Sequence, residues 1–181
     1  MCGINGFANY NNESQALIRQ MNNKIRHRGP DDEGFYMDES ISLGHRRLSI
    51  IDLSEKGKQP IFNEDRSLCI IFNGEIYNFQ ELKKELEKKG HKFLSQTDTE
   101  VVLHLFEEYK EDCPKHLNGI FAFAIWDIKN KELFLFRDRI GVKPLYYYFQ
   151  NNKFIFSSEI KSATLKARSI SPSLIASINR F

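Results

Sequence analysis

The stretch GIFAFAIWD, residues 119–127, is the first of four short apolar runs that decide the fold of this chain. The runs that follow are ELFLFRD (132–138), PLYYYFQ (144–150) and KFIFSSE (153–159), joined by polar turns such as KNK and QNN. Short runs rich in aromatic residues and bounded by turns are typical of strands. Because these runs are apolar at nearly every position, we expect the strands to be covered on both faces.

The rest of the chain mixes predicted helices and strands in blocks. Apolar residues at helical spacing predict helices, and short β-branched or apolar runs predict strands. The predicted segments are strands at 3–9, 35–38, 41–51 and 67–72, loops at 26–34 and 52–60, helices at 12–25, 78–90 and 97–109, and a helix starting near Glu159. Asn78 and Thr97 stand where N-caps are expected, each with Glu three residues on, and Gly90 is a natural stop.

Blocks of strands and helices, rather than strict alternation, predict an α+β fold of antiparallel sheets with helices packed outside. The 181 residues suffice for one domain with its own core, and 41% hydrophobic against 28% charged residues is typical of a globular protein. A formal net charge of +2 gives no sign of nucleic-acid binding.

The cysteines and the chain start predict a compartment. An odd set of three cysteines forms no disulfide framework, which favours a reducing environment. The longest apolar run is too short to span a bilayer, and the N-terminus lacks the pattern of an export signal. We therefore expect a cytoplasmic protein that contacts neither membrane nor nucleic acid.

The chain opens with MCGINGF, which places Cys2 directly after the initiator methionine. Cys2 could be a chance terminal residue or a small buried thiol. Alternatively, removal of Met1 would leave Cys2 with a free α-amine, which titrates at about pH 8 and can act as a base for its own thiol. In that scheme Gly3 leaves room for a substrate to approach.

Asn73 and Gly74, in IFNGEIYNF, are a second candidate for chemistry. Asn-Gly is a strong hairpin signal, but a capped helix follows it here instead of a second strand. An Asn side chain and a Gly backbone N–H at a strand end suit an oxyanion hole. The Asn-Gly pair at 118–119 is interpreted as a plain turn.

Two charged positions could hold a substrate. In GHRRLSIIDL, strand alternation sends Arg46 and Arg47 to opposite faces, so one of them can reach a pocket and bind a carboxylate; a surface arginine pair is the alternative. Asp98 could hold an amino group, or it could simply pair with the helix dipole. Zinc binding by Cys113 and His116 lacks a second ligand pair, and no metal site is predicted.

Taken together, these stretches resemble the glutaminase domain of glutamine-hydrolysing asparagine synthetases, class II glutamine amidotransferases of the N-terminal-nucleophile hydrolases. The similarity runs in order along nearly the whole chain. It is carried by MCGI, RHRGPDDEG, GHRRLSIIDL, FNGEIYN, TDTEV, LNGIFAFAIWD, RDRIGVKPLYYY and SSEIK. The resemblance implies a four-layer αββα sandwich of two antiparallel sheets flanked by helices.

The resemblance also implies roles for individual residues. Cys2 would attack the side-chain amide of L-glutamine, giving a thioester, ammonia and, after hydrolysis, glutamate. Asn73 and Gly74 would form the oxyanion hole. The other residues it marks are Arg47 for the substrate carboxylate, Glu75 and Asp98 for the rest of the glutamine, the backbone of Ser49, Ile50 and Ile51 lining the pocket, and Arg28 supporting the nucleophile.

In the family a second domain binds ATP and activates aspartate, and its pyrophosphate loop does not occur in residues 1–181. We expect residues 1–181 to be the glutaminase domain, with 165–181 approaching a C-terminal synthetase domain. This domain would need no cofactor, whereas ATP and Mg would bind the synthetase part, which accepts the ammonia; a homodimer is compatible with the resemblance. The alternatives are a non-catalytic module that binds glutamine or docks on a synthetase, an amidotransferase domain with another acceptor, and a self-processing hydrolase of a different amide.

Overall fold

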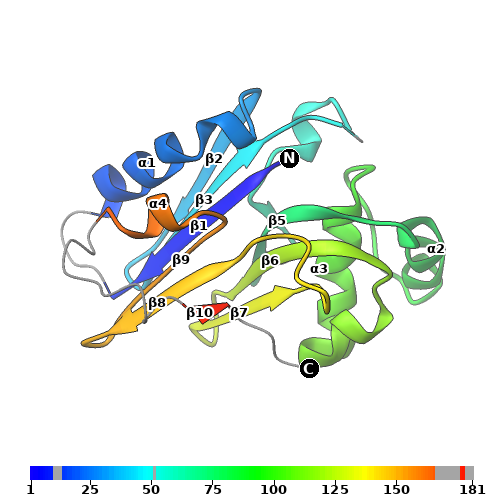
Figure 1. Ribbon diagram of the computed structural model, residues 1–181. Helices are drawn as coiled ribbons and strands as arrows, with labels where there is room; N and C mark the ends of the chain where they lie inside the picture. Colours follow the sequence, from blue (N-terminus) through cyan, green and yellow to red (C-terminus); the bar gives the residue numbers. More distant parts are fainter. Residues whose placement is uncertain (10–13, 51, 166–175, 178–181) are drawn as a thin grey trace.

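Two antiparallel sheets form the middle of the molecule (Figure 1). The computed structural model describes residues 1–9, 14–50, 52–165 and 176–177. The larger sheet has the strand order β10-β8-β9-β1-β3-β2, and the smaller has the order β4-β5-β6-β7. The strands of the two sheets are β1 (Gly3–Ala8), β2 (Asp32–Met37), β3 (Ile41–Arg47), β4 (Ile61–Phe62), β5 (Leu68–Ile76), β6 (Gly119–Asp127), β7 (Glu132–Arg137), β8 (Tyr146–Gln150), β9 (Lys153–Ser157) and β10 (Ala176–Ser177).

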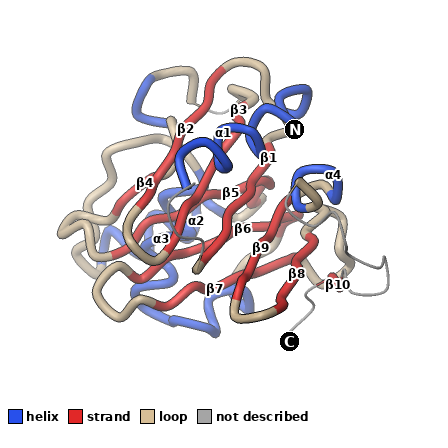
Figure 2. Tube along the Cα trace, turned by 90° about the vertical axis from the view of Figure 1, so that its left-hand side faces the viewer, coloured by secondary structure: helices blue, strands red, loops and turns tan. Residues whose placement is uncertain are grey.

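Helices cover the outer face of each sheet, as Figures 1 and 2 show. The helices α1 (Ser14–Lys24) and α4 (Ile160–Ala163) lie on the six-stranded sheet, and α2 (Phe79–Lys88) and α3 (Asp98–Tyr109) lie on the four-stranded sheet. Short 3₁₀ segments are η1 (Arg26–Arg28), η2 (Glu55–Gly57) and η3 (Lys110–His116). This order of layers confirms the predicted four-layer αββα sandwich.

Three apolar clusters hold the layers together. The cluster between the two sheets includes Ile4, Leu43, Ile71 and Trp126. A second cluster joins the four-stranded sheet to α2 and α3, and a third joins the six-stranded sheet to α1 and α4. Each sheet therefore buries both faces, because one face meets the other sheet and the opposite face meets helices.

Strand burial depends on position within the sheet. The central strand β6 is buried from Phe121 to Asp127, as the apolar pattern predicts. The prediction of full cover is wrong for β7 and β8, which are half-buried or exposed at most positions. The strand β7 lies at the edge of the smaller sheet, so its outer residues have a neighbour on one side only.

Several predicted boundaries are wrong, and each shift has a pairing reason. The strand predicted at 41–51 ends at Arg47, where pairing with β2 stops at Asp32. Residues 32–34, predicted as loop, belong to β2 because they pair with that same end of β3. The short strand β4 and the segment η3 were not predicted. Residues 12 and 13 of the first predicted helix lie outside the described residues.

The predicted helix signals differ in outcome. Thr97 caps α3, because its Oγ1 accepts from Glu100 N at 3.3 Å, and Gly90 ends α2 with a φ of +103°. Asn78 stands at the N-cap of α2, but its side chain makes no cap bond. Instead it accepts from Asn118 N at 3.0 Å and donates to His116 O at 3.0 Å. Asn78 therefore ties the start of α2 to the start of β6.

Within the part of the chain that the structure describes, no helix combines the length and apolar character needed to cross a bilayer.

Candidate active site

A cavity of about 180 Å³ opens near the start of β1 and the end of β5. Such a volume is below the roughly 300–1,000 Å³ of pockets for drug-sized ligands, so it suits a molecule of amino-acid size. Seven of the candidate residues line it: Cys2, Arg47, Ile50, Asn73, Gly74, Glu75 and Asp98. The fold thus brings together residues from positions 2 to 98 of the sequence.

Cys2 lies just before β1 with its thiol half-buried against the end of β3. Leu48 N donates to the Cys2 Sγ at 3.4 Å, and Sγ lies 3.7 Å from Leu48 O. Burial raises the pKa of the Cys2 thiol, and the nearby Asp98 carboxylate adds to the rise. The thiol is therefore protonated at neutral pH and needs a base before it can act as a nucleophile.

Asn73 points toward the six-stranded sheet. Phe72 and Ile76 of β5 pack toward the helices, whereas Ile71 faces the other sheet, and Asn73 shares the parity of Ile71. Asn73 is 1% exposed, and neither its amide nitrogen nor its amide oxygen has a hydrogen-bond partner. A buried amide without partners is costly for the fold, so it is a candidate for binding a ligand.

Gly74 presents its backbone N–H on the side of β5 away from β6. Phe72 N donates to Gln59 Oε1 at 2.6 Å and Ile76 N donates to Asp98 Oδ2 at 3.0 Å, both on that side. Because N–H groups alternate along a paired strand, the N–H of Gly74 points the same way, along the cavity that Gly74 lines. The prediction of a strand end at Asn73 is wrong, since pairing with β6 continues through Ile76.

Arg47 is the last residue of β3, and the structure confirms that Arg46 faces the other way. Arg47 donates through Nη1 to Ser54 O at 3.0 Å and through Nη2 to Asp52 O. Arg46 instead pairs with Glu33 at 2.9 Å and donates to Asn22 O. Two backbone carbonyls therefore hold the Arg47 guanidinium at the cavity wall.

Asp98 is the first residue of α3 and is 4% exposed. Burial raises the pKa of its carboxyl to about 6, and the charge of Glu75 adds to the rise. One of its oxygens accepts from Ile76 N, while Glu75 itself is exposed on the cavity rim. A buried carboxylate beside a second one is an electrostatic site for a cation such as an ammonium group.

Arg28 lies outside the cavity but holds the backbone of Cys2. Its Nε donates to Cys2 O at 3.0 Å, and its Nη1 pairs with Glu159 at 3.0 Å. The space beside Gly3 is filled, because a Cβ there would lie 2.9 Å from Ile25 Cδ1 and 3.2 Å from Arg28 Cδ. Gly3 thus allows close packing onto these side chains, and the expectation that it leaves room for a substrate is wrong.

Of residues 49–51, which the resemblance marks as pocket lining, the structure describes two. Ser49 does not line the cavity; its N donates to Asp31 Oδ2 at 2.8 Å. Ile50 lines the rim and is 72% exposed. Ile51 lies outside the described residues.

Sequence reasoning missed several residues of the cavity wall. Gln59 bridges Phe72 N and, at 3.2 Å, Thr99 Oγ1, so it joins the loop before β4 to β5 and α3. Lys143 is 7% exposed, lines the cavity and lies 3.0 Å from Met1 Sδ. Lys143 lies within RDRIGVKPLYYY, a stretch that carried the resemblance, whereas nothing in the sequence around Gln59 marks it.

The surroundings of Cys113 and His116, the weak zinc pair considered in the sequence, do not favour metal binding. Cys113 is fully buried, and burial raises the pKa of its thiol. His116 is stacked on the ring of Tyr109 at 3.9 Å between centroids. A neutral buried thiol is a poor metal ligand, so Cys113 acts as a small apolar core residue.

The chain belongs to the glutamine amidotransferase domain family, whose family model matches residues 1–177. It is 48% identical over 167 residues to asparagine synthetase [glutamine-hydrolyzing] 1 of Bacillus subtilis, covering 90% of this chain and 26% of that protein. It is 42% identical over 166 residues to asparagine synthetase [glutamine-hydrolyzing] 2 of Oryza sativa subsp. japonica, covering 90% and 28%. The chain therefore spans about a quarter of the length of these relatives.

Solved structures with the same fold share little sequence with this chain. The glutamine phosphoribosylpyrophosphate amidotransferase from B. subtilis, complexed with ADP and GMP, superposes with a TM-score of 0.76 at 21% identity. The match covers 89% of this chain and 42% of that one. A structure titled as the allosteric regulatory enzyme of purine biosynthesis gives 0.75 at 22% identity, again over 89% and 42%. These likenesses confirm the fold alone.

Proposed function

We propose that this domain hydrolyses the side-chain amide of L-glutamine, with Cys2 as the nucleophile. One observation carries the proposal: the Cys2 thiol and the unpartnered amide of Asn73 line the same small cavity. A nucleophile and an unpaired donor in one cavity are the two parts that acyl transfer from an amide requires.

The first step uses the α-amine that Cys2 has once Met1 is removed. While Met1 is attached, the nitrogen of Cys2 is an amide and cannot take a proton. The free amine takes the Sγ proton, and the sulfur forms a bond to the amide carbon of glutamine. The C–N bond then breaks, the proton leaves with the nitrogen as ammonia, and a glutamyl thioester remains on Cys2.

The oxyanion of the tetrahedral intermediate would be held by Asn73 and Gly74. Asn73 and Gly74 both line the cavity, and the amide of Asn73 has no competing protein partner. In the second step water attacks the thioester carbon, the amine accepts one water proton, and glutamate leaves as the C–S bond breaks. The thiolate then regains its proton.

The head group of glutamine would be held by opposite charges. Arg47 offers a guanidinium fixed by two backbone carbonyls, which suits the α-carboxylate. Asp98 and Glu75 suit the α-ammonium group, and that cation would return the pKa of Asp98 toward its ordinary value. Ile50 would supply part of the pocket rim, and Arg28 would hold the Cys2 backbone in place.

The ammonia acceptor is proposed from the relatives. Both asparagine synthetases compared above are named as glutamine-hydrolysing, and this chain matches about a quarter of each. We infer that ammonia passes to a synthetase domain or subunit that makes asparagine, in the cytoplasm. Most of residues 165–181, expected from the resemblance to approach it, lie outside the described residues. ATP and Mg²⁺ would bind that synthetase part.

The test is the intact mass of the chain before and after incubation with 6-diazo-5-oxo-norleucine, a glutamine mimic that alkylates the nucleophile. We expect a chain lacking Met1 that gains one adduct, mapped to Cys2, and no adduct on a Cys2→Ser chain. A processed chain that gains no adduct but still binds glutamine would favour the non-catalytic module instead. An adduct on Cys69 or Cys113 would refute the assignment of the nucleophile.

A further inference from the structure

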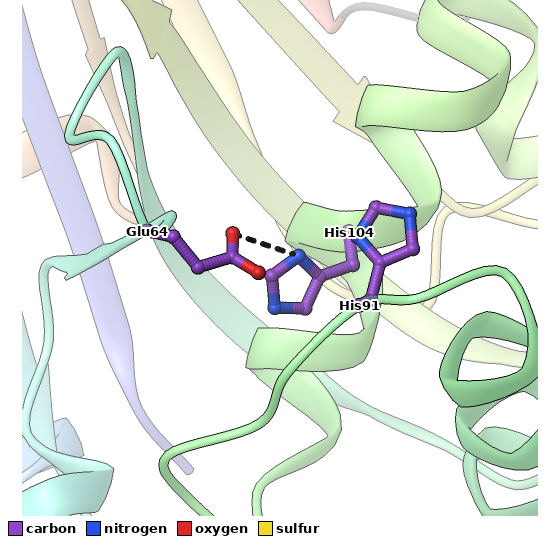
Figure 3. Close-up of side chains that lie close together, drawn as sticks. All are labelled: Glu64, His91 and His104. Carbon is purple, nitrogen blue, oxygen red and sulfur yellow. Dashed lines mark ion pairs between the residues drawn. The ribbon is translucent and has the colours of Figure 1, made fainter.

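A second cluster of side chains lies on α3, outside the residues that line the cavity. Glu64 comes from the turn between β4 and β5, His91 from the loop after α2, and His104 from α3 (Figure 3). One ligand-type atom from each of these three residues lies within 4.8 Å of the other two. Three separate segments of the smaller sheet and its helices thus meet at one point.

The distances identify the atoms that converge. His104 Nδ1 lies 3.8 Å from Glu64 Oε2 and 2.6 Å from Glu107 Oε2. His91 Nδ1 lies 3.5 Å from that same Glu107 oxygen. In a tetrahedral zinc site with bonds of about 2.0–2.2 Å, ligand atoms are about 3.3–3.6 Å apart. The three proposed ligand atoms lie within 4.8 Å of one another, so binding an ion would require the set to close by about 1 Å.

The side chain of Glu64 would make most of the required movement, because it is accessible. The side chain of Glu64 is 45% exposed, whereas that of His104 is 1% exposed. His104 is held by the ring of Phe93 at 4.8 Å and by the ring of His91 at 4.8 Å between centroids. The two imidazoles are therefore fixed by packing, and the carboxylate at the rim can close over an ion.

The cluster has more negative than positive groups. His104 faces Glu64, Glu100 and Glu107, and His91 faces Glu107 and Glu108. A nearby cation, Lys89, pairs with Glu108 on the outer side of this cluster. Four carboxylates around two imidazoles favour a bound cation, because like charges close together are costly unless neutralised.

His104 also has an unsatisfied ring nitrogen. Its Nδ1 bonds to Glu107, while its buried Nε2 has no hydrogen-bond partner and lies 3.9 Å from Glu100 Oε1. A metal on Nδ1 would replace the proton shared with Glu107. The Nε2–H would then lie 3.9 Å from Glu100 Oε1, and a closer approach of the two would give the arrangement in which a carboxylate orients a metal-bound histidine.

We propose that Glu64, His91 and His104 bind a divalent transition-metal ion of the zinc class. Two imidazole nitrogens and a carboxylate oxygen are ligands that suit a zinc-class ion better than they suit magnesium or calcium. The ion would join the β4–β5 turn, the loop after α2 and α3. Because His104 lies six residues, fewer than two turns, after Asp98 on α3, the ion would stiffen the helix that holds the cavity wall.

The test is zinc binding to the Cys2→Ser chain, which leaves two fully buried thiols, Cys69 and Cys113. Titration calorimetry should give one site, and Co²⁺ in its place should show the visible bands of tetrahedral cobalt coordinated by nitrogen and oxygen. Glu64→Gln and His91→Asn should each weaken zinc binding by about tenfold or more. Glu64→Gln keeps the oxygen that accepts from Lys92 N, so the turn should still form.

The matched control is His116→Gln, which removes an exposed histidine outside the cluster and should leave zinc affinity unchanged. Thermal unfolding in EDTA should be the same for the parent, Glu64→Gln and control chains, which separates lost binding from lost folding. Zinc binding that survives both cluster variants, or no zinc binding to a folded parent chain, would overturn the proposal.

Discussion

Replacing Asp98 with asparagine should stabilise the unliganded domain at neutral pH. Burial raises the pKa of the Asp98 carboxyl from 3.8 to about 6. Each pKa unit corresponds to about 1.4 kcal/mol, so keeping Asp98 ionised costs the folded state about 3 kcal/mol. Asparagine retains an oxygen that can accept from Ile76 N, but its amide nitrogen needs a new partner. We therefore expect a net gain of about 2 kcal/mol in the free energy of unfolding.

The gain should depend on pH in a defined direction. Between about pH 4 and pH 6 the folded chain binds more protons at Asp98 than the unfolded chain does. Parent stability from this group therefore falls as pH rises through that window, and the full penalty is present above about pH 6. Below about pH 4 both states hold a neutral group, so the advantage of Asp98→Asn should disappear and only the cost of about 1 kcal/mol for its unpaired amide nitrogen should remain.

Urea unfolding of both chains at pH 8, 6 and 4 measures this difference, with equal m-values as the check that the unfolded states match. Ile76→Val, in the neighbouring strand β5 and outside the cavity lining, is a control whose stability change should not vary with pH. The reasoning is refuted if Asp98→Asn is less stable than the parent at pH 8. It is refuted equally if the difference is the same at all three values.

The same substitution should impair glutamine turnover. Loss of a buried charge pair with the substrate ammonium typically costs about 2–5 kcal/mol, which is a fall in kcat/KM of about 30-fold or more. Stability and activity should therefore change in opposite directions, as expected where a fold holds a charge for a ligand. Steady-state release of ammonia measures this second half of the prediction.

Three further results are expected. Asn73→Ala should lower kcat about 10²–10³-fold in the ammonia assay, because a donor to the oxyanion is lost; the melting temperature should not fall, since the amide has no protein partner, and a large drop would contradict this. A chain with a residue retained before Cys2 should bind glutamine in calorimetry but release no ammonia, and turnover at the parental rate would disprove the role of the amine. Ile71→Ala, between the sheets, should lower the free energy of unfolding in urea by about 2–5 kcal/mol. In native buffer the diazo mimic should still alkylate Cys2 of this variant. Loss of that labelling would show that the cavity depends on the Ile71 side chain.

Local patterns in the sequence predicted antiparallel sheets with helices outside, and the resemblance to the family added their number of layers. The run at 119–127 is β6 with the same bounds, because a strand at the centre of a sheet is apolar on both sides and ends where turn residues begin. Thr97 and Gly90 mark helix ends through their own backbone and side-chain preferences. Such features depend on neighbours in the sequence, so they can be predicted without the fold.

Edges and register were decided by pairing between distant segments. β2 begins at Asp32, within a stretch predicted as loop, because β3 offers it a partner through Arg47. β5 continues through Gly74 and Ile76 because β6 pairs with it as far as Gly119. Backbone hydrogen bonding between strands overrides local turn signals such as Asn-Gly, and no window of sequence contains that information.

For the candidate site, the sequence by itself determined which residue types could act: the N-terminal Cys2, the Asn-Gly pair and one arginine of two. Only the tertiary structure showed that these residues line one cavity, that Gln59 and Lys143 belong to its wall, and that Ser49 does not. Only the tertiary structure brought Glu64, His91 and His104 together, from three segments without a spacing motif. The physical reason is that chemical type is a property of each residue, whereas burial, orientation and pKa arise from neighbours that folding brings close.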